Sequence, residues 1–214
     1  MFLIRSIGYV LLSRTQGGVS DKLEAMSAAE LTDEDLMLRY SADDTGAFEE
    51  LYRRHRNGLY RYLLRQVGQA ALAEELYQDI WLNVVRARKR YTVQSRFATY
   101  LYRIAHNRVI DHYRGRGQVI TLSLEQDERV DADCLTDDPA CGPEEIVCIA
   151  QQAERLMDLI ERLPEPQREA FLMHEEGGLN VDEIAQATGV NRETAKSRLR
   201  YAYARLKQGL RDDR

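Results

Sequence analysis

Apolar residues return every three or four positions along much of the chain, a spacing that predicts amphipathic helices. In the first half this spacing covers three long segments, at about 45–67, 70–90 and 95–114, after a shorter helix near 33–40. Gly68 follows the first long segment in the position of a helix C-cap. No sustained alternation of apolar and polar residues appears, so we predict a helical domain without strands.

The second half keeps the helical spacing but is divided by prolines and glycines. Pro164 and Pro166 end a helix at about 143–163 and begin the next one. A short helix at 180–187, a tight turn and a long helix at 191–210 follow. This succession predicts a helix-turn-helix domain.

A segment without periodicity separates the two helical halves. Residues 118–142 are acidic and contain Asp-Pro and Gly-Pro pairs, which is typical of a linker. We therefore predict two small all-α domains, at 32–117 and 143–214, joined by a flexible acidic linker. Residues 1–31 are expected to be a poorly ordered extension, and the apolar run within them is too short to span a membrane.

Charge is strongly segregated along the chain, although the formal net charge is only −5. Residues 86–116 contain nine basic residues and one acidic residue, whereas residues 122–149 contain nine acidic residues and one basic residue. The last 24 residues are basic again, with eight bases against three acids. Two basic blocks on either side of an acidic one predict two polyanion-binding surfaces. Arginine accounts for 26 of the 30 bases, and it binds phosphate in bidentate fashion.

The cysteine and histidine residues give no indication of a disulfide-stabilised fold or of a metal site. Three cysteines are too few to staple a secreted domain of this size, so the chain is expected to be reduced and cytoplasmic. The four histidines lack metal-ligand spacing. We therefore expect no cofactor, no metal and no catalytic residues.

The final helix has the two-faced character of a DNA recognition helix. One face carries Arg192, Lys196, Ser197 and Arg200, which would point into a major groove. The opposite face is expected to be buried through Ala195, Leu199, Ala202, Leu206 and Leu210. An ordinary amphipathic surface helix with solvated charges remains the alternative.

Aromatic residues interleave with the first basic block. One stripe of the helix at 95–114 carries a set that could follow a phosphate backbone and stack an unpaired base: Arg96, Tyr100, Arg103, Asn107 and Arg114. Phe97 and Tyr102 are instead expected to belong to the core.

The third helix carries acidic and amide side chains away from its apolar stripe. Glu75, Gln78 and Asp79 lie three and four residues apart, so they share a face. Paired carboxylates could serve acid–base chemistry, but a solvated face or a protein-docking surface is the better interpretation.

Four segments together resemble the extracytoplasmic-function (ECF) sigma factors, a group of the bacterial sigma-70 family. AFEELYRRH at 47–55 resembles the first helix of the family's second region, and AEELYQDIWL at 73–82 its polymerase-binding segment. FATYLYRIAHN at 97–107, with DHYR at 111–114, resembles its promoter-melting segment. Residues 163–199 resemble its fourth region. At Tyr100 the sequence departs from the family, which usually has tryptophan there.

The resemblance implies a subunit that directs core RNA polymerase to promoters of a stress or envelope regulon. Glu75, Gln78 and Asp79 would dock on the beta-prime clamp helices, and the beta flap and an anti-sigma factor would be further partners. The 86–114 block would capture the minus-ten strand, with a base flipped into a pocket near residues 88–97. The minus-thirty-five element of promoter DNA would be read by a set on the final helix: Arg192, Glu193, Lys196, Ser197 and Arg200.

Two other interpretations are open at this point. The chain could be a two-domain helix-turn-helix regulator that acts without being a polymerase subunit. It could also be a nucleic-acid-processing enzyme that uses Glu75, Asp79 or the histidines.

Overall fold

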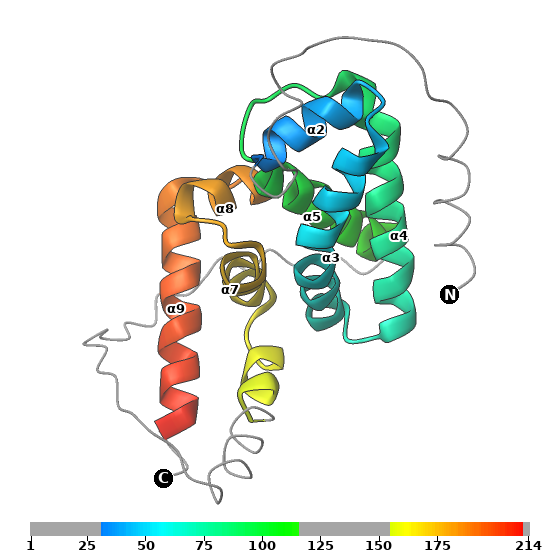
Figure 1. The fold of residues 1–214 in the computed structure, drawn as a ribbon. Helices are drawn as coiled ribbons and strands as arrows, with labels where there is room; N and C mark the ends of the chain where they lie inside the picture. Colours follow the sequence, from blue (N-terminus) through cyan, green and yellow to red (C-terminus); the bar gives the residue numbers. More distant parts are fainter. Residues whose placement is uncertain (1–30, 116–154, 212–214) are drawn as a thin grey trace, which may run out of the picture.

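The computed structural model describes residues 31–115 and 155–211, which form two helical units (Figure 1). Neither described range contains a strand. The N-terminal unit consists of α2 (Asp33–Ser41), α3 (Thr45–Val67), α4 (Ala70–Ala87), the 3₁₀ helix η1 (Arg88–Arg90) and α5 (Phe97–Gly115). The C-terminal unit consists of a helical turn at 155–161, α7 (Glu165–Gly177), α8 (Val181–Thr188) and α9 (Arg192–Arg211).

The all-α fold predicted from the periodicity is confirmed, with small shifts at helix ends. The helix predicted at 70–90 becomes a 3₁₀ helix after Ala87. There the side chains of Arg88 and Lys89 donate hydrogen bonds to Asp43, just after the end of α2. The next helix begins at Phe97, whose N–H donates to Glu34 Oε1 at 2.6 Å. A carboxylate from another helix therefore satisfies one of the free donors of this N-terminus.

Residues 116–154 lie outside the described part of the chain, as do 1–30 and 212–214. The predicted linker at 118–142, the predicted N-terminal extension and the start of the helix predicted at 143–163 fall there. The domain bounds 32–117 and 143–214 therefore stay predictions.

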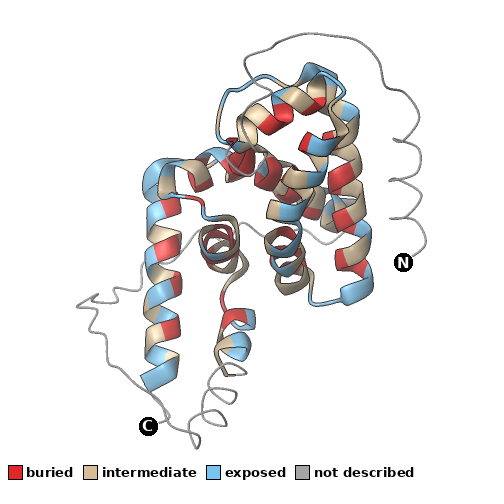
Figure 2. Ribbon diagram, viewed as in Figure 1, coloured by how far each residue is buried: buried red, intermediate tan, exposed pale blue. Residues whose placement is uncertain are grey.

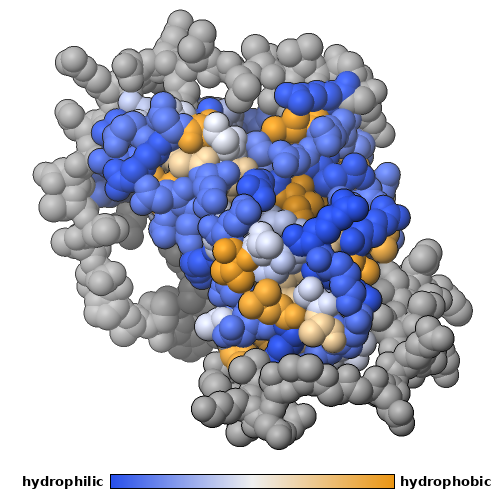
Figure 3. All heavy atoms as spheres, turned by 90° about the horizontal axis from the view of Figure 1, so that it is seen from above, coloured by the Kyte–Doolittle hydropathy of each residue, from blue (hydrophilic) through white to orange (hydrophobic). Residues whose placement is uncertain are grey.

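The core runs along the inner faces of the helices in both units (Figure 2). Phe97 and Tyr102 are buried, as expected. On α9 the predicted apolar face is buried from Ala195 to Leu206, but Leu210 is exposed. The prediction for Leu210 was wrong because the described core ends one turn before it. The surface seen from above is mainly hydrophilic, with small hydrophobic groups between charged residues (Figure 3).

The two units pack against each other through α3, α5, α7 and α8. This interface contains the buried carboxylate of Glu169 on α7, a residue that is 9% exposed. Its Oε1 accepts a hydrogen bond from the Tyr62 hydroxyl at 3.0 Å and lies 2.6 Å from His106 Nδ1. Burial raises the pKa of Tyr62 well above its ordinary value, so this phenol stays a donor.

A second acid and two glycines extend the same interface. Glu176 on α7 forms ion pairs with Arg61 and Arg65 of α3. A Cβ on Gly58 would overlap the carbonyl oxygen of Glu176, and one on Gly177 would lie 2.9 Å from the Tyr102 ring. Glycine at both positions therefore permits the close approach of α3, α5 and α7.

Within the N-terminal unit, Asp33 fastens α2 to α3. Its carboxylate accepts from Arg54 at 2.8 Å and lies 2.6 Å from His55 Nε2. Burial would raise the pKa of Asp33, but the hydrogen bonds and charges of His55 and Arg54 outweigh burial and lower it below 3.8. A depressed folded-state pKa means that this stabilisation is present above the unfolded-state pKa and is lost as the pH falls through the folded-state value.

We expect Asp33→Asn to lower the free energy of unfolding by about 1 kcal/mol at pH 7, because the charge-assisted hydrogen bonds are partly solvent-screened. Denaturant unfolding of both chains should give a difference that begins to shrink as the pH falls to the ordinary aspartate pKa of 3.8, where the unfolded-state carboxyl binds protons, and shrinks further toward the lower folded-state pKa. A difference that is constant down to pH 3 would contradict the role of the carboxylate charge.

Candidate nucleic-acid interface

Two hollows lie beside Tyr100 of α5. One hollow, of about 410 Å³, lies between α4 and α5, and the other, of about 280 Å³, lies against the loop that precedes α5. The Tyr100 ring lines both. Its ring centroid lies 5.4 Å from that of Tyr91 in a T-shaped contact. The loop hollow is lined by Arg90, Tyr91, Thr92, Gln94 and Ser95, which lie in the region where the family resemblance implies a flipped base.

The two tyrosines are neutral aromatic surfaces at physiological pH. Burial, followed by the charge of Glu34, raises the pKa of Tyr91 to about 12, and burial also raises the pKa of Tyr100. A neutral, half-buried ring beside a hollow is suited to stacking an unpaired base.

Ion pairing divides the basic block into two groups. Arg88 and Lys89 are committed to Asp43, so they fasten η1 to the end of α2. By contrast, Arg86, Arg90 and Arg103 form no hydrogen bond or ion pair with any other residue in the described ranges, and all three are exposed. Exposed arginines around two hollows, unpaired within the described part of the chain, have the geometry of a phosphate-binding surface.

The other residues predicted on this stripe lie in different settings. Asn107 is exposed at the rim of the α4–α5 hollow, and Arg114 is exposed near the end of α5. Arg96 precedes the helix and donates to Glu183 and to the Gly178 carbonyl of the C-terminal unit. The structure therefore brings Tyr100, Arg103 and Asn107 together, whereas Arg96 is engaged across the interface between the units.

The predicted polymerase-docking residues share a face of α4, as their spacing requires. Glu75 is exposed, Gln78 donates to Glu74, and Asp79 forms an ion pair with Arg108 of α5. Sequence reasoning missed this pair and also missed Asn83, which lies one turn beyond Asp79 and lines the α4–α5 hollow. The i, i+4 spacing from Asp79 was the signal that could have placed Asn83 on this face.

The helix-turn-helix is built from local capping interactions. Asn180 and Glu183 form a reciprocal capping box at the start of α8, and Gly189 ends that helix at a φ of 72°. Asn191 Oδ1 then accepts from the Thr194 N–H at 2.7 Å, so the side chain of Asn191 caps α9. These caps fix the angle at which α9 leaves the turn.

The predicted recognition face of α9 is open to solvent. Arg192, Glu193, Lys196 and Arg200 are exposed, and Ser197 is half-buried. Arg192 forms an ion pair with Asp182 at 2.8 Å, and the Arg200 guanidinium lies 4.9 Å from the centroid of the Tyr201 ring. Lys196 and Arg200 are thus placed one turn apart on a free basic surface.

Two ranges of the chain, one in each helical unit, match models of known protein families. Residues 51–119 match the model for Sigma-70 region 2, and residues 153–206 match the model for Sigma-70 region 4. The chain belongs to the sigma-70 family, in its ECF group. This membership favours a sigma factor over a helix-turn-helix regulator that acts without polymerase. Factors of this family initiate transcription by binding DNA and are not enzymes, which disfavours the enzymatic interpretation.

The ECF sigma factor has similar relatives along most of its length. It is 29% identical over 172 residues to the RNA polymerase sigma factor CarQ of Myxococcus xanthus, covering 80% of this chain and 94% of that protein. It is 30% identical over 178 residues to the ECF RNA polymerase sigma factor SigD of Mycobacterium bovis, covering 80% of this chain and 79% of SigD.

Solved structures share the fold of the ECF sigma factor. CnrH, solved in complex with the cytosolic domain of CnrY, has a TM-score of 0.59 at 19% identity and covers 85% of this chain and 99% of CnrH. RpoE from Bartonella quintana, solved with the anti-sigma factor NepR, has a TM-score of 0.56 at 20% identity. The match covers 78% of this chain and 98% of RpoE.

Two absences apply to the described residues of this sigma factor. No helix there combines the length and the apolar character that a membrane crossing requires. Nor do three or more histidine, cysteine or acidic side chains gather in these ranges in a way that could hold a metal ion.

Proposed function

We propose that this ECF sigma factor captures the single-stranded minus-ten element at the two hollows beside Tyr100 of α5. The observation that carries the proposal is the set of arginines around Tyr100 that have no hydrogen-bond or ion-pair partner within residues 31–115 and 155–211: Arg86, Arg90 and Arg103. Arginines of this kind follow a phosphate backbone, while the Tyr100 ring stacks a base that has left the duplex. Unstacking costs a few kcal/mol per base, and stacking on an aromatic ring returns about 1–3 kcal/mol.

The minus-thirty-five element is read by α9 in this proposal. Arg192, Lys196 and Arg200 lie on its exposed face, with Glu193 and Ser197 between them. Its N-terminal turns would enter the major groove, where arginine and lysine bind guanine and glutamate accepts from cytosine.

Run-off transcription with purified core polymerase on genomic DNA tests this function. The sigma factor should direct initiation at defined promoters that core polymerase alone does not use. In the Arg200→Ala chain, initiation at promoters that need a minus-thirty-five element should fall about tenfold, with core affinity unchanged. Equal transcript patterns with and without the protein would overturn the proposed function.

The partners follow from the same surfaces. Core polymerase docks on the α4 face that carries Glu75, Gln78 and Asp79, with the beta-prime clamp helices as the acceptor and the beta flap as the contact of the C-terminal unit. An anti-sigma factor is a further partner, which is supported by the complexes in which the two similar structures were solved.

We expect Asp79→Lys to weaken core binding by about tenfold or more, because the substitution reverses the charge that this face presents in the proposed complex. The Asp79 side chain is 38% exposed, so the substitution does not bury a charge. The matched control is Arg108→Ala, which breaks the same intramolecular ion pair but leaves the face acidic. Equal core affinity for Asp79→Lys and the native chain, measured by titration of labelled core, would exclude Asp79 from the docking surface.

A further inference from the structure

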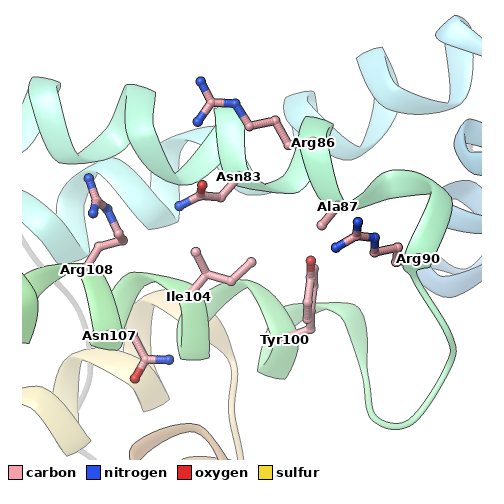
Figure 4. A pocket seen from close by; sticks show the side chains of 8 residues that line it. All are labelled: Asn83, Arg86, Ala87, Arg90, Tyr100, Ile104, Asn107 and Arg108. Atoms are coloured by element: carbon pink, nitrogen blue, oxygen red, sulfur yellow. The ribbon is translucent and has the colours of Figure 1, made fainter.

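The hollow between α4 and α5 has the lining of a nucleotide site in its own right. Figure 4 shows Asn83 and Ala87 extending from α4 toward α5, and Tyr100, Ile104 and Arg108 extending from α5 toward α4. Ala87 and Ile104 supply an apolar floor, and the Tyr100 ring closes one end. Asn83 places an amide, with one donor group and one acceptor, in the space between them.

Positive charge is found at both ends of this hollow. Arg90 approaches beside Tyr100, Arg108 lies at the other end, and Arg86 reaches outward from α4 (Figure 4). No acidic residue lines the hollow in the described part of the chain. Arg108 pairs with Asp79 through Nη2, but its buried Nε has no hydrogen-bond partner there. The guanidinium groups of Arg86, Arg90 and Arg108 therefore give the lining of the hollow a positive charge, which favours an anionic ligand.

We propose that this hollow holds one unstacked nucleotide of the promoter strand, beside the base taken up by the loop hollow. Its volume of about 410 Å³ lies in the range of small-ligand sites. An aromatic ring, an apolar floor, one amide and flanking guanidinium groups match a base with a phosphate on each side. The inference rests on the proposed function and adds to it a second pocket with its own reading residue.

Asn83 is the residue that reads this base. An asparagine amide forms a bidentate pair with the N6 and N7 atoms of adenine, so adenine is the preferred occupant. Tyr100 lines both hollows, together with Ala87 and Arg90, so its ring lies beside both captured bases. The strand would therefore pass Tyr100 with one base in each hollow.

The test uses the sigma factor bound to core polymerase and a promoter identified by run-off transcription. Single-stranded oligonucleotides with a randomised minus-ten segment are selected by the native and variant holoenzymes and then sequenced. The native holoenzyme should select adenine at the position held in the α4–α5 hollow. Asn83→Ala should lower that preference at least fivefold and leave the other positions unchanged. Asn83→Asp should move the preference toward cytosine, whose N4 donates to a carboxylate.

The control is Asn57→Ala, because Asn57 is an exposed asparagine on α3 away from the hollow. Its selection profile should equal that of the native holoenzyme. If Asn83→Ala and Asn83→Asp both keep the native preference at every position, the second pocket is refuted while minus-ten capture stands. If the native holoenzyme selects no sequence at all, both the pocket and the proposed minus-ten capture are refuted.

Discussion

Replacing Tyr100 with alanine is expected to reduce promoter opening by one to two orders of magnitude while core affinity stays unchanged. The Tyr100 ring lines both hollows, so its removal deprives up to two captured bases of their stacking surface. Stacking of a base on an aromatic side chain contributes about 1–3 kcal/mol, and 1.4 kcal/mol is tenfold in an equilibrium. Fluorescence of 2-aminopurine placed in the minus-ten element would follow opening directly.

Tyr100→Phe separates stacking from loss of structure. It keeps the ring and removes only the hydroxyl, so opening should stay within about twofold of the native level. Because Tyr100 also packs against Tyr91 and Phe97, the alanine chain is assayed below its unfolding temperature. Binding of a duplex minus-thirty-five element should be the same for all three chains. Native-level opening by the alanine chain would exclude Tyr100 from strand capture.

Much of the fold could be predicted from sequence because it depends on local interactions. The helix-turn-helix is set by the Asn180–Glu183 capping box, the positive φ of Gly189 and the Asn191 cap, all of which act within a few residues. The buried stripe on α9 follows from periodicity as far as Leu206. The periodicity also predicted burial of Leu210, which is exposed. Its burial depends on how far the neighbouring helices extend, which periodicity does not give.

The candidate site could be predicted only in outline. Nine bases between residues 86 and 116 indicate a basic surface, but the sequence does not say which of them bind other parts of the chain. Arg88 and Lys89 pair with Asp43 more than 40 positions away, and Arg96 with Glu183 of the other unit. Such partners depend on tertiary packing, so only the structure separates them from the arginines that remain available to DNA.

The residues that join the two units could likewise not be predicted from the sequence. Glycines such as Gly58 inside a predicted helix suggest a weak position rather than a contact point. The reason for this glycine appears only when Glu176 of α7 is seen against it. The polar contacts of Glu169 join residues that are 63 and 107 positions apart.

Gly58→Ala is expected to separate the C-terminal unit from the N-terminal bundle. The added Cβ would overlap the Glu176 carbonyl, and backbone cannot move aside without displacing α7. Overpacking of this kind costs about 1–3 kcal/mol, which corresponds to a shift of about 5-fold to 150-fold toward the open form. Alanine is a better helix former than glycine by about 1 kcal/mol, so α3 itself should not weaken.

Hydrogen exchange of the full chain would measure this separation element by element. Amides of α7 and α8 should exchange faster in Gly58→Ala, while those of α2 and α4 should keep their native rates. Gly46→Ala is the matched control in the same helix, because its Cβ would lie 3.4 Å from its nearest neighbour, an ordinary contact. Opening also frees Arg96 from Glu183, so the Gly58→Ala chain should bind single-stranded DNA more tightly than the native chain. Native exchange rates throughout α7 and α8 would show that the interface tolerates the methyl group and that this glycine does not control closure.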